Sequence, residues 1–172
     1  MSARIRSTLL IACAITLVVP QVSASTKTVT VKGSYGQTLS ASTSKISSGA
    51  AITVKGNYFD ETVGIYLAFC VMPVKGQVPT PCGGGVNKSG TGDISYWISS
   101  NPPPYGVGLA REFQPGGRFV RTMHIGSTIL TSGGKIDCRK VTCAITVRAD
   151  HTREDDRTHD IYIPITFTSP KK

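Results

Sequence analysis

Short stretches in which apolar and polar residues alternate, each closed by a turn residue, recur along this sequence. Residues 28–32 and 51–55 alternate with a period of two, which is typical of strands with one buried face, and a glycine follows each. Similar segments predict five further strands, at residues 63–71, 94–98, 119–125, 141–149 and 161–167. No segment carries a convincing apolar stripe at helical spacing. The chain is therefore predicted to be all-β.

Glycine- and proline-rich clusters separate the predicted strands, for example at residues 83–85, 101–106 and 115–117. Seven short strands with such connections are typical of an antiparallel β-sandwich. We predict a seven-strand antiparallel immunoglobulin-like β-sandwich with two local disulfides. In the last strand, residues 161–167, the odd positions are all apolar. Pro164 lies on the other face and indicates an edge position or a bulge.

Residues 1–24 have the three parts of a secretory signal peptide. Two arginines precede an apolar run over residues 8–19, and compact side chains at 22–24 form a cleavage site. The run is too short to span a membrane, which takes about 20 apolar residues. A lipoprotein box ending at Cys13 is an alternative, but the apolar run continues past that cysteine. The protein is expected to be secreted and extracellular, without a transmembrane anchor.

The remainder of the 172 residues has room for one domain of ordinary size. Residues 25–37 are assigned to an N-terminal extension or an extra strand, and residues 38–168 to the sandwich. Residues 169–172 form a basic tail. This division predicts that the residues responsible for function lie in a single small domain.

Basic residues exceed acidic ones and give a formal net charge of +9, with the surplus spread along the chain. Proteins that bind nucleic acids directly usually gather Lys and Arg on one face or in one run. The distribution argues against direct nucleic-acid binding and is typical of a soluble basic surface. It also permits a weak attraction to anionic cell-wall polymers or membrane surfaces.

Four of the five cysteines lie outside the signal segment. An even number in an exported chain predicts two disulfides, and the count alone allows three arrangements. Adjacency in the sequence favours Cys70 with Cys82 and Cys138 with Cys143. Each such bridge would stabilise the fold by about 2–3 kcal/mol. A zinc site is the alternative, but the Cys-x-x-Cys spacing is absent and no histidine lies near either pair, so no metal and no cofactor is predicted.

The sequence contains neither a Gly-x-Ser-x-Gly nucleophile elbow nor a phosphate-binding glycine loop. Its glutamates are scattered, and its cysteines are expected to be bridged. We therefore predict that the protein is not an enzyme and assign no catalytic residue.

The segment from Asp150 to Asp160 gathers carboxylates, histidines and arginines. Carboxylate oxygens suit calcium and imidazoles suit zinc. The spacing follows neither an EF-hand nor a zinc signature. We interpret the segment as a solvated loop between two strands, in which Arg153 and Arg157 neutralise the acids.

Four aromatic residues surround the proline-rich loop: Tyr96, Trp97, Tyr105 and Phe113. Together they could wall an apolar pocket. A single tryptophan in a small sandwich usually packs in the core, and Trp97 is expected there. Tyr105 lies on the loop itself and is the better candidate for contact with a ligand or partner.

Asp137, Cys138 and Cys143 form an Asp-Cys-x4-Cys segment that leads into the predicted strand at 141–149. This segment resembles the neocarzinostatin family, the apoproteins of enediyne antibiotics. The resemblance extends over about residues 38–168 and includes a first disulfide hairpin. It implies a seven-strand sandwich that holds an apolar chromophore non-covalently in a cleft. It also implies an antibiotic carrier whose released chromophore, and not the protein, attacks DNA.

The resemblance implies a position for that cleft at one end of the sandwich. Carried over by position, the cleft would be lined by the Cys70–Cys82 bridge, Tyr66, Met72, Thr80, Ala144 and Arg148. The loop with Tyr105 would cover it. This sequence departs from the family at two of these positions, because Met72 replaces an aromatic residue and Ala144 replaces a polar amide.

Two functions are consistent with these features. The first is a secreted, non-enzymatic binding protein that holds a small apolar or aromatic ligand in its cleft. The second is an extracellular immunoglobulin-like interaction module, cell-wall associated, with no small-molecule ligand. The cysteine positions fit both functions, whereas the departures at Met72 and Ala144 favour the second.

Overall fold

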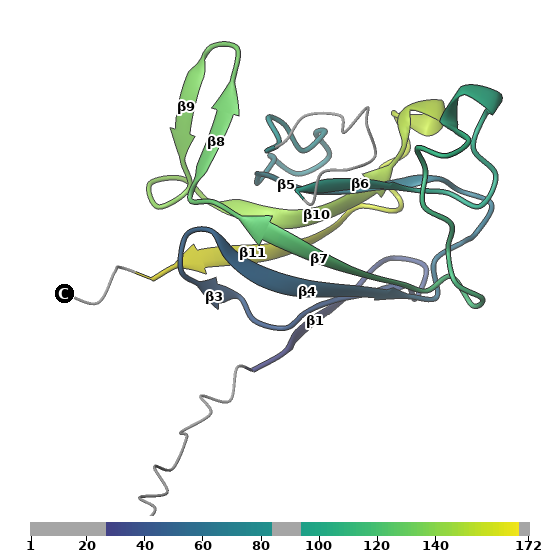
Figure 1. The fold of residues 1–172 in the computed structure, drawn as a ribbon, viewed down its shortest axis with the longest axis horizontal. Coiled ribbons are helices and arrows are strands. Elements are labelled where there is room, and N and C mark those ends of the chain that lie inside the picture. Colours follow the sequence, from purple (N-terminus) through teal and green to yellow (C-terminus); the bar gives the residue numbers. More distant parts are fainter. Residues whose placement is uncertain (1–26, 84–93, 169–172) are drawn as a thin grey trace, which may run out of the picture.

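The computed structural model describes residues 27–83 and 94–168, and these residues form two facing β-sheets (Figure 1). The first sheet has the strand order β1-β2-β4-β7 and consists of β1 (Val29–Lys32), β2 (Thr38–Ala41), β4 (Ala50–Asn57) and β7 (Phe119–Ile125). The second has the order β3-β11-β10-β5-β6 and consists of β3 (Lys45–Ile46), β11 (Ile161–Phe167), β10 (Cys143–Ala149), β5 (Ile65–Val71) and β6 (Ser95–Ile98).

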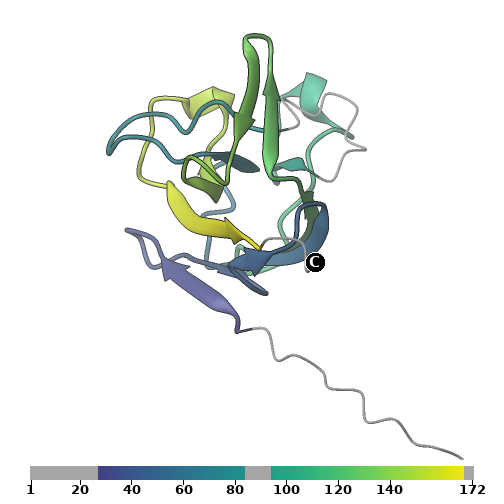
Figure 2. The ribbon, with the colours of Figure 1, turned by 90° about the vertical axis from the view of Figure 1, so that its left-hand side faces the viewer.

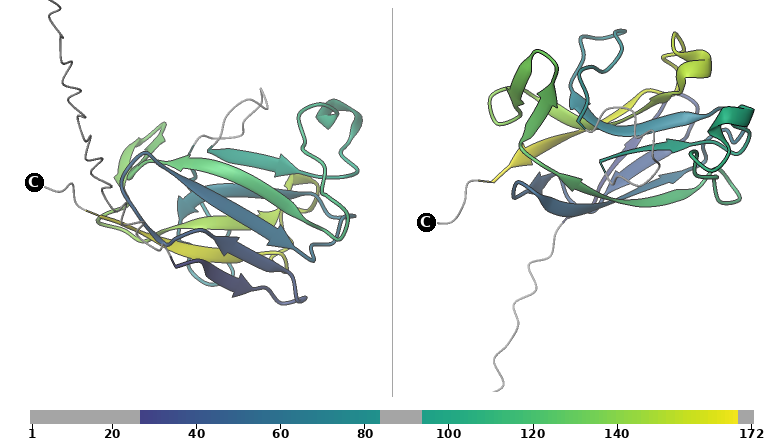
Figure 3. Two further views of the ribbon diagram at one scale, coloured as in Figure 1. Left: turned by 60° about the horizontal axis from the view of Figure 1, so that its bottom comes forward. Right: turned by 45° about the horizontal axis from the view of Figure 1, so that its top comes forward.

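A two-stranded hairpin and two short 3-10 helices complete the described residues. The hairpin consists of β8 (Thr128–Thr131) and β9 (Gly134–Asp137), and the helices are η1 (Pro104–Gly106) and η2 (His151–Arg153). The hairpin rises from the side of the five-stranded sheet (Figure 2). Both helices lie at the end of the molecule away from the hairpin (Figure 3). Neither is long and apolar enough to cross a membrane.

The core lies between the two sheets and follows the period-two alternation of the strands. In β5 and β10, the inward positions are apolar and join one buried cluster: Ile65, Leu67, Phe69, Cys143, Ile145 and Val147. The four-stranded sheet contributes its own buried side chains to this cluster: Leu39, Ala41, Ile52, Val54, Phe119, Met123 and Ile125. Burial of these side chains supplies the main driving force for folding. The alternation leaves the other face of β5 and β10 free to serve another purpose.

The predicted fold class is confirmed as an all-β sandwich with two local disulfides. All seven predicted strand regions contain strands. Four strands were missed, namely β2, β3, β8 and β9, each of only two to four residues. The β3–β11 pair is parallel, so the sandwich is not antiparallel throughout. The predicted signal peptide, the box at Cys13 and the basic tail lie outside the described residues.

Two predicted features of single strands can be compared with the structure. β1 pairs with β2 at the edge of the four-stranded sheet, where the sequence allowed an extra strand or an extension. Pro164 pairs with Ala144 on one side, and β3 meets β11 only at Thr166 and Phe167. On the side away from β10, Pro164 therefore has no strand partner among the described strands. A proline has no N–H to donate to a neighbouring strand, so this position agrees with the predicted edge position.

Both disulfides have the predicted local pairing. Cys70–Cys82 spans 12 residues, and Cys138–Cys143 spans 5. The first bridge ties the loop after β5 back onto its own strand, and the backbone of the loop adds two hydrogen bonds. The N–H of Val71 donates to Pro81 at 3.0 Å, and that of Gly83 donates to Phe69 at 2.7 Å. This loop is therefore anchored along β5 at several points.

Removing each disulfide tests how much the closed loops stabilise the domain. The variant Cys70→Ala/Cys82→Ala is expected to lose about 3 kcal/mol of unfolding free energy, and Cys138→Ala/Cys143→Ala about 2 kcal/mol. The difference follows from the longer loop of the first bridge. Urea unfolding of the wild type and both variants measures these losses. A larger loss for the 138–143 variant would contradict the account from loop length.

Candidate functional site

A hollow of about 680 Å³ lies on the outer face of the five-stranded sheet, the face that does not pack in the core. We call it the aromatic hollow. Its base is formed by strand residues of β5, β6 and β10: Tyr66, Ala68, Ser95, Trp97 and Arg148. Tyr96 of β6, whose ring packs against the core, also lines the hollow. One wall is the loop after β5, and the other is made of the η1 region and η2. The wall residues are Val78, Pro79, Thr80 and Cys82 on one side and Tyr105, Leu109 and His151 on the other.

Aromatic rings from four separate segments, β5, β6, η1 and η2, meet at one side of this hollow. The ring centroids of Trp97 and Tyr66 are 6.2 Å apart, and those of Trp97 and Tyr105 are 6.3 Å apart. The imidazole of His151 lies edge-on to Trp97, with centroids 5.0 Å apart. Such spacings are those of interacting aromatic pairs. The hollow thus presents an apolar, ring-lined surface that suits a flat ligand.

His151 joins the two tyrosines of the hollow. The Tyr66 hydroxyl hydrogen-bonds its Nδ1, and its Nε2 lies 2.7 Å from the Tyr105 hydroxyl. Burial, reinforced by the negative charge of Asp150, raises the pKa of Tyr66 above its usual value, so this hydroxyl keeps its proton and can donate. An imidazole with one N–H group also has one acceptor nitrogen, so either tautomer allows His151 to hydrogen-bond both tyrosine hydroxyls. This chain of hydrogen bonds holds the η1 wall to the sheet.

Asp150 fixes both η2 and the tryptophan. Its Oδ1 accepts from the backbone N–H of Thr152 at 2.9 Å, which caps the start of the 3-10 helix. Its Oδ2 accepts from the indole Nε1 of Trp97 at 2.8 Å. The residue is only 2% exposed, and these hydrogen bonds compensate for burying a carboxylate. The same side chain therefore sets the position of His151 and the orientation of the Trp97 ring.

Among the described residues that line the hollow, Arg148 is the one with a permanently charged side chain. It lies opposite Tyr66 in the β5–β10 register, and its guanidinium carbon is 5.0 Å from the centroid of the Tyr66 ring. Its Nη1 donates to the carbonyl of Ala149 at 3.2 Å. The contact with the ring is a cation–π interaction that holds the guanidinium over the base of the hollow.

The sequence-predicted cleft residues divide into two groups in the structure. Tyr66, Thr80, Arg148 and Tyr105 line the hollow, as does Cys82 of the first bridge. Ala144 shares a sheet face with Arg148, but it is completely buried opposite Cys70. Met72 follows β5 and donates its backbone N–H to Thr142 at 2.9 Å, outside the residues that line the hollow. Any ligand contact by these six residues remains a prediction.

The expectation that Trp97 packs in the core is wrong. Tyr96 and Ile98 of β6 face the core, so Trp97 between them faces outward into the hollow. Phe113, which the sequence placed beside it, is instead buried among Phe59 and Phe119. The alternation around Ile98 was the signal that indicates the outward face of Trp97. His151 was missed as a pocket residue because its tyrosine partners are distant in the sequence.

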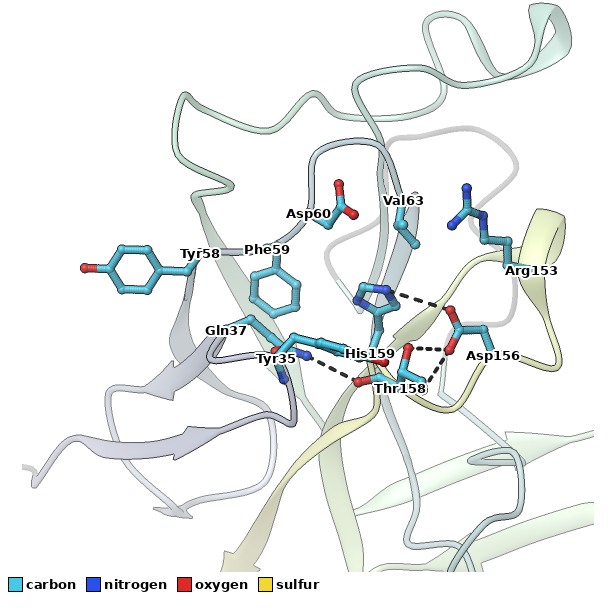
Figure 4. A pocket seen from close by; sticks show the side chains of 10 residues that line it. All are labelled: Tyr35, Gln37, Tyr58, Phe59, Asp60, Val63, Arg153, Asp156, Thr158 and His159. Carbon is cyan, nitrogen blue, oxygen red and sulfur yellow. Dashed lines mark hydrogen bonds and ion pairs between the residues drawn. The ribbon is translucent and has the colours of Figure 1, made fainter.

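A second hollow, of about 390 Å³, lies beside residues 153–159 of the loop between β10 and β11 (Figure 4). The two aspartates that line it stabilise turns of the backbone. The Oδ1 of Asp60 accepts from the N–H of Thr62 at 2.9 Å, and that of Asp156 accepts from the N–H of Thr158 at 2.8 Å. Hydrogen bonds from the side chains of Thr62 and Thr158 keep the pKa values of both acids below their usual range. These local contacts engage both carboxylates of the second hollow, and we take the aromatic hollow as the candidate site.

The loop from Asp150 to Asp160 is not solvated throughout, contrary to its interpretation from sequence. Asp150 and His159 are buried at 2% and 8% exposure. Arg157 pairs with Asp160 at 3.4 Å, as expected, whereas Arg153 reaches the rim of the second hollow. Among the described residues, no three His, Cys, Asp or Glu side chains gather in a way that could hold a metal ion.

Gly106 provides a test of the contact between η1 and Trp97. A Cβ on Gly106 would lie 2.3 Å from the Cη2 atom of the indole, so Gly106→Ala must push the two apart. We expect a loss of about 1–3 kcal/mol in stability and a red shift of the fluorescence of this single tryptophan. The control is Gly126→Ala, whose Cβ would meet nothing closer than 3.9 Å. Equal effects of the two variants would contradict the packing described for η1.

No protein-family model and no curated protein sequence matches this chain. Solved structures do. Macromomycin aligns with 77% of this chain and 99% of its own length, at 13% identity and a TM-score of 0.51. Apokedarcidin covers 76% of this chain and 96% of its own length, at 16% identity and a TM-score of 0.46. Both are enediyne apoproteins of the neocarzinostatin family. The resemblance to that family seen in the sequence is thus confirmed in the fold, which is similar to that of macromomycin.

Proposed function

We propose that this protein is a secreted, non-enzymatic carrier that holds a small planar aromatic ligand in the aromatic hollow. The observation that carries the proposal is the meeting of Tyr66, Trp97 and Tyr105 around one hollow. Rings arranged in this way offer face and edge contacts worth about 0.5–1.5 kcal/mol each to an aromatic guest. The likeness of the fold to macromomycin supports the same interpretation.

The size of the hollow supports a ligand of several fused rings. Its volume of about 680 Å³ falls within the range of about 300–1,000 Å³ that is usual for small-molecule sites. The base is formed by strands and one wall is fixed by a disulfide, so much of the surface is formed before a ligand arrives. A preformed surface lowers the entropic cost of binding.

The chemistry of the lining favours binding over catalysis. His151 is the lining residue best suited to act as a general base, and tyrosine hydroxyls occupy both of its ring nitrogens. Cys82 is held in a disulfide and cannot act as a nucleophile. The carrier would therefore protect and deliver its ligand, and any attack on DNA would belong to the ligand, as the family resemblance implies.

Filling the hollow tests the proposal. The probe is naphthalene-1-carboxamide, a neutral two-ring compound, and binding is followed through the emission of Trp97. We expect a dissociation constant of about 100 µM for a ligand of this size. Ala68 lies on the base in β5, so Ala68→Phe should occupy the space and weaken binding at least about tenfold.

The matched control is Ala51→Phe, which adds the same ring at an exposed position of β4, in the other sheet. It should leave binding unchanged. Circular dichroism would show that both variants are folded. If Ala68→Phe binds the probe as well as the wild type does, the ligand site is elsewhere. If no form binds any flat aromatic compound, the interaction module without a ligand is the better description.

Export is a separate part of the proposal and has its own test. The signal-like segment over residues 1–24 and the two disulfides support an extracellular location, where such bridges persist. N-terminal sequencing of protein recovered from culture medium should read from about Ser25. Retention in the cell, or a lipid on Cys13, would contradict secretion by this route.

A further inference from the structure

Arg148 is a cation of the aromatic hollow that forms no ion pair among the described residues. The residue is partly buried, and its guanidinium lies over the Tyr66 ring, with one hydrogen bond to the carbonyl of Ala149. One N–H group is satisfied by that carbonyl, which leaves other donors of the guanidinium available.

Two carboxylates of the loop that follows β10, Asp150 and Asp160, are engaged with other groups. Asp150 accepts hydrogen bonds from Trp97 and Thr152, and it does not line the hollow. Asp160 accepts from the hydroxyl of Tyr162 at 2.6 Å and pairs with Arg157 at 3.4 Å. Neither aspartate reaches Arg148 within ion-pair distance. None of the described residues that line the hollow is acidic, so an anion that enters would meet the positive charge of Arg148 and no lining carboxylate from the described part of the chain.

We propose that the ligand of the aromatic hollow is a planar aromatic anion whose acidic group pairs with Arg148. This inference rests on the proposed function and narrows its ligand class. A guanidinium over an aromatic ring has further N–H donors that can form a bidentate pair with a carboxylate. The ligand's rings would then lie against Tyr66 and Trp97. Partial burial makes such a pair stronger than one in open water.

Two probes of nearly the same shape test the charge. 1-Naphthoate and naphthalene-1-carboxamide share their ring system and differ in whether the attached group is charged. We expect the wild type to bind naphthoate at least about tenfold more tightly at low salt, since a charge-assisted pair replaces a neutral contact. Raising sodium chloride should weaken naphthoate binding and leave carboxamide binding unchanged. Isothermal calorimetry measures both affinities independently of Trp97.

Substitutions of Arg148 locate the source of the preference. Arg148→Met keeps the apolar stem over Tyr66 and should remove the preference for naphthoate over the carboxamide, measured as the ratio of the two dissociation constants. Arg148→Lys keeps the charge but lacks the planar fork, so it should retain part of the preference. The matched control is Arg153→Met, an exposed arginine at the second hollow. It lowers the net charge equally and should leave the preference intact.

The outcomes separate this inference from the proposed function. If both probes bind equally and Arg148→Met changes nothing, the ligand is not selected for negative charge, although the carrier function stands. If Arg153→Met removes the preference as much as Arg148→Met does, the preference comes from overall charge, and the inference fails. If neither the wild type nor Arg148→Lys binds either probe, the carrier function itself fails.

Discussion

The alternation of side chains along β5 and β10 gives the five-stranded sheet two different faces. On one face, Leu67 and Ile145 belong to the core. On the other, Tyr66 and Arg148 face each other in register and form the base of the aromatic hollow. A register shift of one residue would exchange the two faces, and the core would lose its apolar side chains at the same moment as the hollow lost its rings. Stability and the site therefore depend on the same strand pairing.

The sequence predicts those parts of the fold that depend on local pattern. The sandwich is predicted by its long apolar strands, its turn residues and two pairs of cysteines close together in the sequence. Each of these is a pattern among neighbouring residues. The strands of two to four residues, such as β3, carry too few positions for a period to be recognised. The β8–β9 hairpin is short and exposes Leu130, so its pattern lacks a clear apolar face. These elements form because the longer strands bring their ends together.

The site is only partly predictable for a related reason. Tyr66, Thr80 and Arg148 were found through positions in a family resemblance, and Tyr105 through its place on a loop. His151 contacts Tyr66 and Tyr105 across separations of 85 and 46 residues. No single-sequence pattern encodes a contact at such a distance. Trp97 was misassigned because a general preference of tryptophan for the core was given more weight than the alternation of its own strand.

The two walls of the hollow are held by different kinds of bond. The loop after β5 is joined to its strand covalently through Cys70–Cys82, whereas Tyr105 is held within the opposite wall by a hydrogen bond to His151. A hydrogen bond contributes only about 0.5–1.5 kcal/mol net, so the two walls differ in the energy needed to displace them. In the proposed carrier, a guest would enter and leave past Tyr105. The residence time of the complex would then depend on that hydroxyl contact, while the opposite wall governs which shapes fit.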